Sequence, residues 1–227
     1  MNSPVPFACD RPDARGRLPD WLGARAAALR VAAVVAVCIG CAVVIASGVV
    51  LLLQYENAPG DAGDTPSQWP RGSVLALDAT RPTLVVCAHP RCPCTRATIG
   101  ELERLMARLQ GKIVSHVLFF TPSDAPLQWA RTDLWNSAER IPGVAVHSDP
   151  GGIDARKFGA VTSGHTVLYS RGGDLMFHGG ITGSRGHAGD NAGSLAIESL
   201  LRDGVADRTQ THVYGCSLLD QHLQDGD

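Results

Sequence analysis

The chain has 227 residues, of which 44% are hydrophobic, and a formal net charge of −2 at pH 7. This length holds one ordinary domain with additional segments. The near-neutral charge offers no basic excess of the kind that nucleic-acid-binding proteins use, and no acidic run typical of a solvating tail. We therefore expect no nucleic-acid partner.

The first predicted element is a membrane-spanning helix at residues 31–53, the run VAAVVAVCIGCAVVIASGVVLLL, which has no charge and no proline. At about 1.5 Å per residue this helix reaches about 35 Å, enough to cross a hydrocarbon core of about 30 Å. A cleaved signal peptide is the competing interpretation. The length of the run and of the segment before it favours an uncleaved signal anchor.

The flanks of this run predict its orientation. Acidic residues follow the run, whereas five arginines precede it: Arg11, Arg15, Arg17, Arg25 and Arg30. By the positive-inside rule, residues 1–30 are cytoplasmic. The remainder of the chain then lies on the extracytoplasmic, periplasmic side as part of a single-pass membrane protein.

Residues 54–70 are rich in Pro, Gly, Asp and Ser and predict a flexible tether. A folded α/β domain is expected at residues 71–205, followed by a C-terminal tail at 206–227. Its predicted elements in chain order are a strand at 83–88, a helix at 97–110, a strand at 113–120, a helix at 126–140, a strand at 143–147, a helical turn at 154–158, a hairpin with arms 165–169 and 174–178, and a helix at 191–201.

A cysteine motif stands between the first strand and the first long helix, in the run HPRCPCTRATIGELERL. This arrangement resembles the thioredoxin fold over residues 71–203. The resemblance implies a central mixed sheet flanked by helices. Three stretches, AHPRCPCTRA, FGAVTSGHTVLY and GGITGSRGHAGDN, also resemble bacterial RedB-type proteins, a thioredoxin-like group.

Cys92 and Cys94 stand where the strand gives way to the helix, with Pro93 at a natural first helical position. The unpaired amides and the positive end of the helix dipole favour a thiolate there. We therefore expect at least one of the two thiols to ionise more readily than a free cysteine. Three basic residues nearby add positive charge: His89, Arg91 and Arg96.

The spacing of these cysteines departs from the family that the motif resembles. A thioredoxin motif has two residues between its cysteines, whereas here only Pro93 lies between them. Aligning Pro93 and Cys94 with the family's Pro-Cys puts Arg91 at the position of the attacking cysteine. If Cys92 is the nucleophile instead, a disulfide to Cys94 closes a small ring, and a strained disulfide has a raised reduction potential.

The other cysteines have different expected roles. Cys87 lies inside an apolar strand and is predicted to be a small buried hydrophobic residue. Cys9 is expected in the cytoplasm, and Cys38 and Cys41 in the membrane, so none of these three reaches the motif. Cys216 leaves three alternatives open: a disulfide with one of the motif cysteines, a third sulfur for a metal, or an unpaired thiol.

His165 is the second informative position. Thioredoxins have a cis-proline followed by Thr before the strand that faces the cysteines, and here His165 precedes Thr166 at the matching point. The Sco group of copper-delivery proteins resembles this chain in having a histidine there. The resemblance implies a copper(I) site of two thiolates and an imidazole, formed by Cys92, Cys94 and His165, with Cys216 as a further candidate ligand. The plain structural interpretation is a hydrogen-bonded histidine.

The loop at residues 181–191, ITGSRGHAGDN, precedes the last helix on the edge where thioredoxin-like folds approach their cysteines. Arg185 and His187 are predicted to cover the site, poise a thiolate or bind an anionic partner. The alternative is a structural loop in which the glycines make turns and Asp190 caps the helix.

Two hypotheses of function follow. The leading one is a membrane-anchored thiol–disulfide oxidoreductase without a cofactor, acting on extracytoplasmic protein thiols. In it, Cys92 is the nucleophile, Cys94 resolves, Arg91 lowers the thiol pKa, and His165 or His187 assists proton transfer. The alternative is a copper(I)-binding or copper-delivery module with a metalloprotein client. A redox sensor that signals across the membrane is a weaker third hypothesis.

Overall fold

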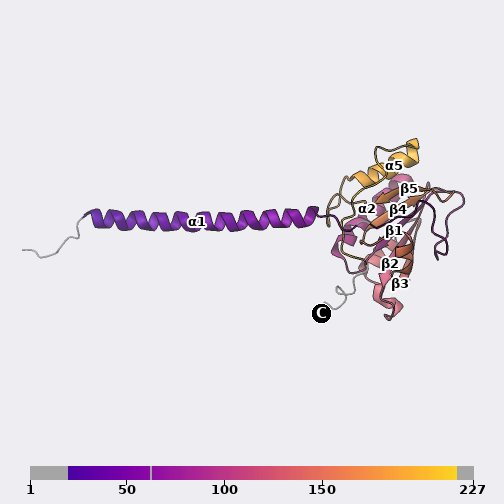
Figure 1. The fold of residues 1–227 in the computed structure, drawn as a ribbon, viewed down its shortest axis with the longest axis horizontal. Coiled ribbons are helices and arrows are strands. Elements are labelled where there is room, and N and C mark those ends of the chain that lie inside the picture. Colours follow the sequence, from indigo (N-terminus) through magenta and orange to yellow (C-terminus); the bar gives the residue numbers. More distant parts are fainter. Residues whose placement is uncertain (1–19, 62, 219–227) are drawn as a thin grey trace, which may run out of the picture. The chain divides into compact units, whose positions relative to one another are not determined.

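The computed structural model describes residues 20–61 and 63–218. The predictions for Cys9, Arg11, Arg15 and Arg17 lie outside these residues. The chain divides into two compact units, residues 1–51 and residues 52–227. Figure 1 shows the elements of both in the colours of the sequence.

The first described element is the helix α1, Asp20–Asn57. Its portion Ala24–Asn57 is long and apolar enough to cross a membrane, a property that a signal sequence near the N-terminus shares. Large apolar side chains such as Val37 and Val44 are exposed along it. The helix therefore has the length and the surface that the apolar run predicts.

The second unit is built on a five-stranded mixed sheet in the order β3-β2-β1-β4-β5 (Figure 1). The parallel strands β1, β2 and β3 precede the antiparallel pair β4 and β5 along the chain. Their bounds are Thr83–Ala88, Val114–Thr121, Val144–Pro150, His165–Tyr169 and Leu175–Gly179. This sheet and its flanking helices confirm the predicted thioredoxin-like α/β fold class.

Alternate residues of the strands point to opposite faces of the sheet, and each face has its own core. Val86 and Phe119 pack with three helices on one face: α2, Pro93–Leu109; α3, Asp133–Glu139; and α5, Ala192–Asp203. On the other face Val85 and Leu118 pack against Phe158, next to the short helix α4, Ile153–Lys157, and against Leu218 of the tail. The described part of the tail, up to Leu218, is therefore packed into the domain.

The predicted tether makes contacts that a flexible segment would lack. Trp69 packs edge-on against Phe158 and Tyr169, with ring centroids 5.1 and 5.3 Å apart respectively. The Tyr169 hydroxyl donates to the carbonyl of Pro66 at 2.8 Å, and the amide of Trp69 donates to Gly173 at 2.7 Å. This segment covers the sheet face that the tail also covers.

Two local predictions need correction. The single helix expected at residues 126–140 is two elements, a 3-10 helix η1 at Leu127–Ala130 and α3, because Thr132 between them has an extended backbone. The cap of α5 is Asn191 and not Asp190, since the Asn191 side chain accepts from the amide of Ser194 at 2.8 Å. The remaining elements lie within a few residues of their expected positions.

Candidate functional site

The site begins where β1 ends and α2 begins. Cys92 is the cap residue of α2, with an extended backbone, and Pro93 is the first helical residue, where its missing amide hydrogen costs nothing. The amide of Cys92 donates to the carbonyl of His89 at 3.2 Å, and the amide of Thr95 donates to the carbonyl of Cys92 at 3.0 Å. These bonds fix the Cys92 sulfur over the first turn of the helix.

The C-terminal tail brings a second sulfur to this point. The amide of Ser163 donates to the carbonyl of Cys216 at 2.9 Å, and Thr162 and Ser217 form an antiparallel bridge. The Sγ atoms of Cys92 and Cys216 lie 2.9 Å apart. Both are free thiols and not a disulfide. They lie this close although 124 positions of sequence separate them.

The surroundings of Cys92 favour its thiolate. The hydrogen bond between the Cys92 and Cys216 sulfurs is the largest cause that lowers the pKa of Cys92 to about 5, and hydrogen bonds from the backbone amides of Cys216, Cys94 and Thr95 add to it against the opposing effect of burial. Two of these amides belong to the helix start, as the sequence predicts. The Cys216 thiol of the tail lowers the pKa of Cys92 more than these amides do, and its position cannot be derived from the sequence.

The partner thiols stay protonated. The hydrogen bond to Cys92, burial and the charge of the Cys92 thiolate raise the pKa of Cys216. Burial, together with the same thiolate, raises the pKa of Cys94. The reduced site therefore holds one thiolate between two thiols.

The loop before α5 covers Cys94. The backbone amide of Gly186 and the charge of Arg185 both act on Cys94 to lower its pKa, against the larger effect of burial. The Arg185 guanidinium also donates to the carbonyl of Gly215, beside Cys216, and to the carbonyl of Ala58 at 3.1 Å. His187 is exposed in the same loop. Arg185 thus joins three segments at the site.

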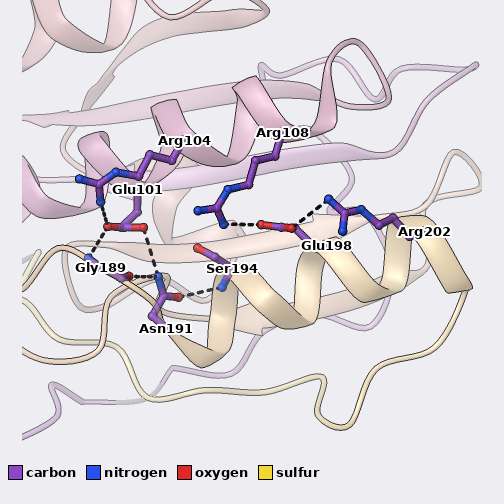
Figure 2. Close-up of polar contacts among 8 residues, drawn as sticks. All are labelled: Glu101, Arg104, Arg108, Gly189, Asn191, Ser194, Glu198 and Arg202. Carbon is purple, nitrogen blue, oxygen red and sulfur yellow. Dashed lines mark hydrogen bonds and ion pairs between the residues drawn. The ribbon is translucent and has the colours of Figure 1, made fainter.

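A glutamate of α2 holds this loop in place (Figure 2). The buried Glu101 carboxylate accepts from the amide of Gly189 at 2.7 Å and from the side chain of Asn191 at 3.4 Å, and it is paired with Arg104. Further along the same two helices, Glu198 of α5 pairs with Arg108 at 2.8 Å. The helix that carries the cysteines therefore also anchors the loop that covers Cys94.

A buried hydrogen-bond network connects the start of α2 to the segment before β4. The Ser163 hydroxyl accepts from the amide of His89 at 2.8 Å and lies 2.9 Å from the Thr95 hydroxyl, which donates to the His89 carbonyl at 3.0 Å. Burial lowers the pKa of His89, and the imidazole stacks against Phe120. The expectation that His89 adds positive charge is therefore wrong at neutral pH.

The two arginines of the motif have partners outside the sulfur pair. The guanidinium of Arg91 lies over the Trp129 ring, 4.4 Å from its centroid, and Arg96 pairs with Asp133. Together with Thr132 they line a cleft of about 260 Å³ that reaches Cys92. Cys92 is one of the residues that line this cleft.

His165 makes its contacts elsewhere. Its Nε2 lies 3.2 Å from the hydroxyl of Thr65, and its ring stacks with that of His178 at a centroid distance of 6.4 Å. Burial lowers the pKa of His165 to about 4, so the imidazole is neutral. From the segment before β4, Ser163 contacts the tail that carries Cys216.

The copper ligand set expected from the sequence is not assembled in this arrangement. Within residues 20–61 and 63–218, no group of three or more His, Cys, Asp or Glu side chains is placed to hold a metal ion. Cys87 is buried in the second core as predicted, and burial raises its pKa. Cys38 and Cys41 lie on α1.

The sequence predicts no role for three positions of the site: Thr95, Ser163 and Gly215. A Cβ atom on Gly215 would lie 1.9 Å from the Ser163 carbonyl oxygen, so only glycine lets the tail approach this closely. The pattern VYGCSLL, with Val213 and Leu218 buried, is the signal that could have indicated a paired segment.

Comparisons with known proteins bear on the fold. No family model matches the chain, and no curated protein matches it. A hypothetical protein from Sinorhizobium meliloti has a similar structure, with a TM-score of 0.53 and 17% identity over 71% of this chain and 94% of that one. An uncharacterized protein from Geobacillus kaustophilus has a TM-score of 0.51 and 18% identity, over 72% and 93%. A secreted Mycobacterium tuberculosis disulfide oxidoreductase has a TM-score of 0.36 and 15% identity, over 44% and 68%. At these identities the first two similarities concern the fold alone.

Proposed function

We propose that this chain is a membrane-anchored thiol–disulfide exchange protein whose nucleophile is Cys92 in the Cys-Pro-Cys motif. One observation carries the proposal: the Cys92 sulfur, at the head of α2, accepts hydrogen bonds that lower its pKa to about 5 and lies 2.9 Å from a second sulfur. A thiolate beside a second thiol is the arrangement that exchange requires.

The reaction balances with the groups present. The Cys92 thiolate attacks one sulfur of a client disulfide, which forms a mixed disulfide and releases one client thiolate. A second thiol of the chain then attacks the Cys92 sulfur, and the second client thiolate leaves with a proton. The client gains two electrons, and the chain becomes a disulfide. The same steps in reverse oxidise a client dithiol.

The setting of the site supports protein thiols as clients. The cleft of about 260 Å³ beside Cys92 is lined in part by Arg91, Arg96 and Thr132, so two cationic side chains flank the route that a client would take to this sulfur. We place the domain on the extracytoplasmic side, with α1 as the anchor and the N-terminus in the cytoplasm. Disulfides form and persist in that compartment.

The proposal is tested on the reduced full-length chain in detergent, by its reduction of the disulfides of insulin. Cys92→Ser should lower the rate by at least about 100-fold, because the nucleophile is gone. Cys38→Ser is the matched control, since Cys38 lies on the apolar helix, and it should leave the rate unchanged. An unchanged rate in Cys92→Ser would refute exchange at this site.

A copper(I) role, implied by the Sco resemblance, is the alternative. One observation favours it: the Nδ1 atom of His165 is buried with no hydrogen-bond partner among the described residues, which leaves a ring nitrogen available. Against it, the other ring nitrogen contacts Thr65, and the described side chains form no ligand group. The likeness to RedB-type proteins adds no chemistry to either role.

The same preparation separates the two roles. Copper(I) affinity is measured by competition with a chromophoric chelator for the wild type and for His165→Ala. We expect weak binding that the substitution leaves unchanged, alongside active exchange. Tight binding that His165→Ala abolishes, combined with negligible exchange, would favour the copper role.

A further inference from the structure

The tail that carries Cys216 is built into the domain. The amide of Gly60 donates to the carbonyl of Val213 at 2.8 Å, and the amide of Leu218 donates to the carbonyl of Val161 at 2.8 Å. Leu218 is buried in the core that includes Cys87 and Phe158. Contacts on both sides of Cys216 therefore hold its sulfur at the site.

Two thiols compete to be the second sulfur of the reaction. Cys94 is separated from Cys92 by Pro93 alone and belongs to the first turn of α2. A disulfide between them would close a small ring that the rigid proline and the helix constrain. Cys216 approaches Cys92 from a separate segment, so a bond to it places no such demand on the helix start.

The causes of the pKa shifts of Cys94 and Cys216 also favour Cys216 as the second sulfur. The Cys92 thiolate is responsible for two of the causes that raise the pKa of Cys216, including the largest, and Arg185 opposes them. When Cys92 enters a mixed disulfide, its negative charge disappears, and both causes disappear with it. The Cys92 thiolate also raises the pKa of Cys94, but the largest cause there is burial, which persists in the mixed disulfide. Formation of the mixed disulfide thus removes the largest cause that acts on Cys216 and leaves the largest cause that acts on Cys94.

We propose that Cys216 is the resolving cysteine, so that the active disulfide joins Cys92 of the helix start to Cys216 of the tail. This inference rests on the proposed exchange function. In the resolving step, the Cys216 sulfur attacks the Cys92 sulfur, the bond between Cys92 and the client breaks, and the client thiolate takes up the Cys216 proton. Cys94 then serves the site through its backbone amide, which donates to the Cys92 sulfur.

The test reacts the reduced full-length chain with oxidised glutathione and follows the products by mass spectrometry. Wild type and Cys94→Ser should end with a Cys92–Cys216 disulfide and no bound glutathione. Cys216→Ser should retain glutathione on Cys92, with its release slowed by at least about tenfold, because the resolving thiol is absent.

Three results are distinguishable. A Cys92–Cys94 disulfide in oxidised wild type, or glutathione trapped by Cys94→Ser and not by Cys216→Ser, would overturn the assignment of Cys216. Failure of all variants to react at Cys92 would instead remove the exchange function itself. Peptide mapping of oxidised wild type needs no substitution, so the test holds even if Cys216→Ser is unfolded by circular dichroism.

Discussion

At the scale of single residues, the site depends on one hydrogen bond between two sulfurs. This hydrogen bond joins Cys92 and Cys216, and it lowers the pKa of Cys92 while it raises that of Cys216. The arginines of the motif contribute less than their position in the sequence predicts, because Arg91 lies over Trp129 and Arg96 pairs with Asp133. The neighbouring thiol and the helix amides set the ionisation.

This arrangement predicts the pH dependence of the thiolate. Ultraviolet absorbance of the reduced chain should show one thiolate forming with a midpoint near pH 5. Cys216→Ala should move that midpoint upward, since the largest cause of the lowered pKa is removed. Cys87→Ala, at a buried cysteine outside the site, should leave it in place. An unmoved midpoint in Cys216→Ala would contradict the claim that the hydrogen bond with Cys216 lowers the pKa of Cys92.

Stability of the reduced chain should follow the same ionisation. In the unfolded chain the Cys92 thiol has an ordinary pKa of about 8.5, so between about pH 5 and 8.5 the unfolded state binds more protons. The contribution of Cys92 is therefore fully present above that range and lost as the pH falls toward 5. Urea unfolding of reduced wild type and Cys92→Ser at pH 5 and 8 measures the difference, which should be larger at pH 8.

At the scale of elements, the loop over Cys94 is held by α2 through Glu101 (Figure 2). Glu101→Gln should weaken this anchor, because the neutral amide accepts more weakly from Gly189 and no longer pairs with Arg104. We expect a loss of about 1–3 kcal/mol of stability, typical of a disturbed buried polar group. Alkylation of Cys94 should become several-fold faster, as measured by peptide mass spectrometry.

The matched control is Glu103→Gln, which removes the same charge from an exposed position of the same helix. It should leave both the stability and the alkylation rate of Cys94 nearly unchanged. Equal effects of the two substitutions would mean that net charge on the helix, and not the anchor, controls the loop.

The regular elements were predictable because their periodicity is local. The strand at residues 83–88 is found at its expected bounds, and α2 begins at Pro93 as the motif suggests. The segment at 58–69 and the tail were not predictable, since irregular chain has no periodicity and its packing depends on distant partners such as Tyr169 and Phe158. Composition alone favoured a tether there.

At the scale of the whole molecule, the site could be predicted only in part. The helix start supplied Cys92 and Cys94 from adjacent sequence, and the loop with Arg185 followed from the fold resemblance. The approach of Cys216 could not be derived, because its sulfur partner is 124 positions away. His165 was assigned to the sulfurs by alignment, whereas its described contacts are with Thr65 and His178.

The separation of Cys92 and Cys216 in the sequence predicts a difference in thermal stability between the reduced and the oxidised chain. In the chain-entropy model, a disulfide that closes a loop of more than 100 residues stabilises by about 4–5 kcal/mol. A Cys92–Cys94 disulfide would close almost no loop and add little. Oxidised wild type should therefore melt at least about 8 °C above the reduced form, since 1 kcal/mol shifts Tm by about 2–4 °C in a domain of this size. Calorimetry of both forms, with Cys94→Ser as the control that keeps the shift, measures this.

The covering of Cys92 has a consequence for what the chain can react with. The pKa of Cys92 is lowered to about 5, yet the residue is only 2% exposed. Ionisation makes a thiol more reactive toward electrophiles, but the surrounding residues restrict which electrophiles can reach the sulfur. Under the proposed exchange function, a flexible disulfide segment should reach this sulfur faster than a disulfide held in a rigid protein surface. Access to Cys92, together with its ionisation, would then determine which disulfides react.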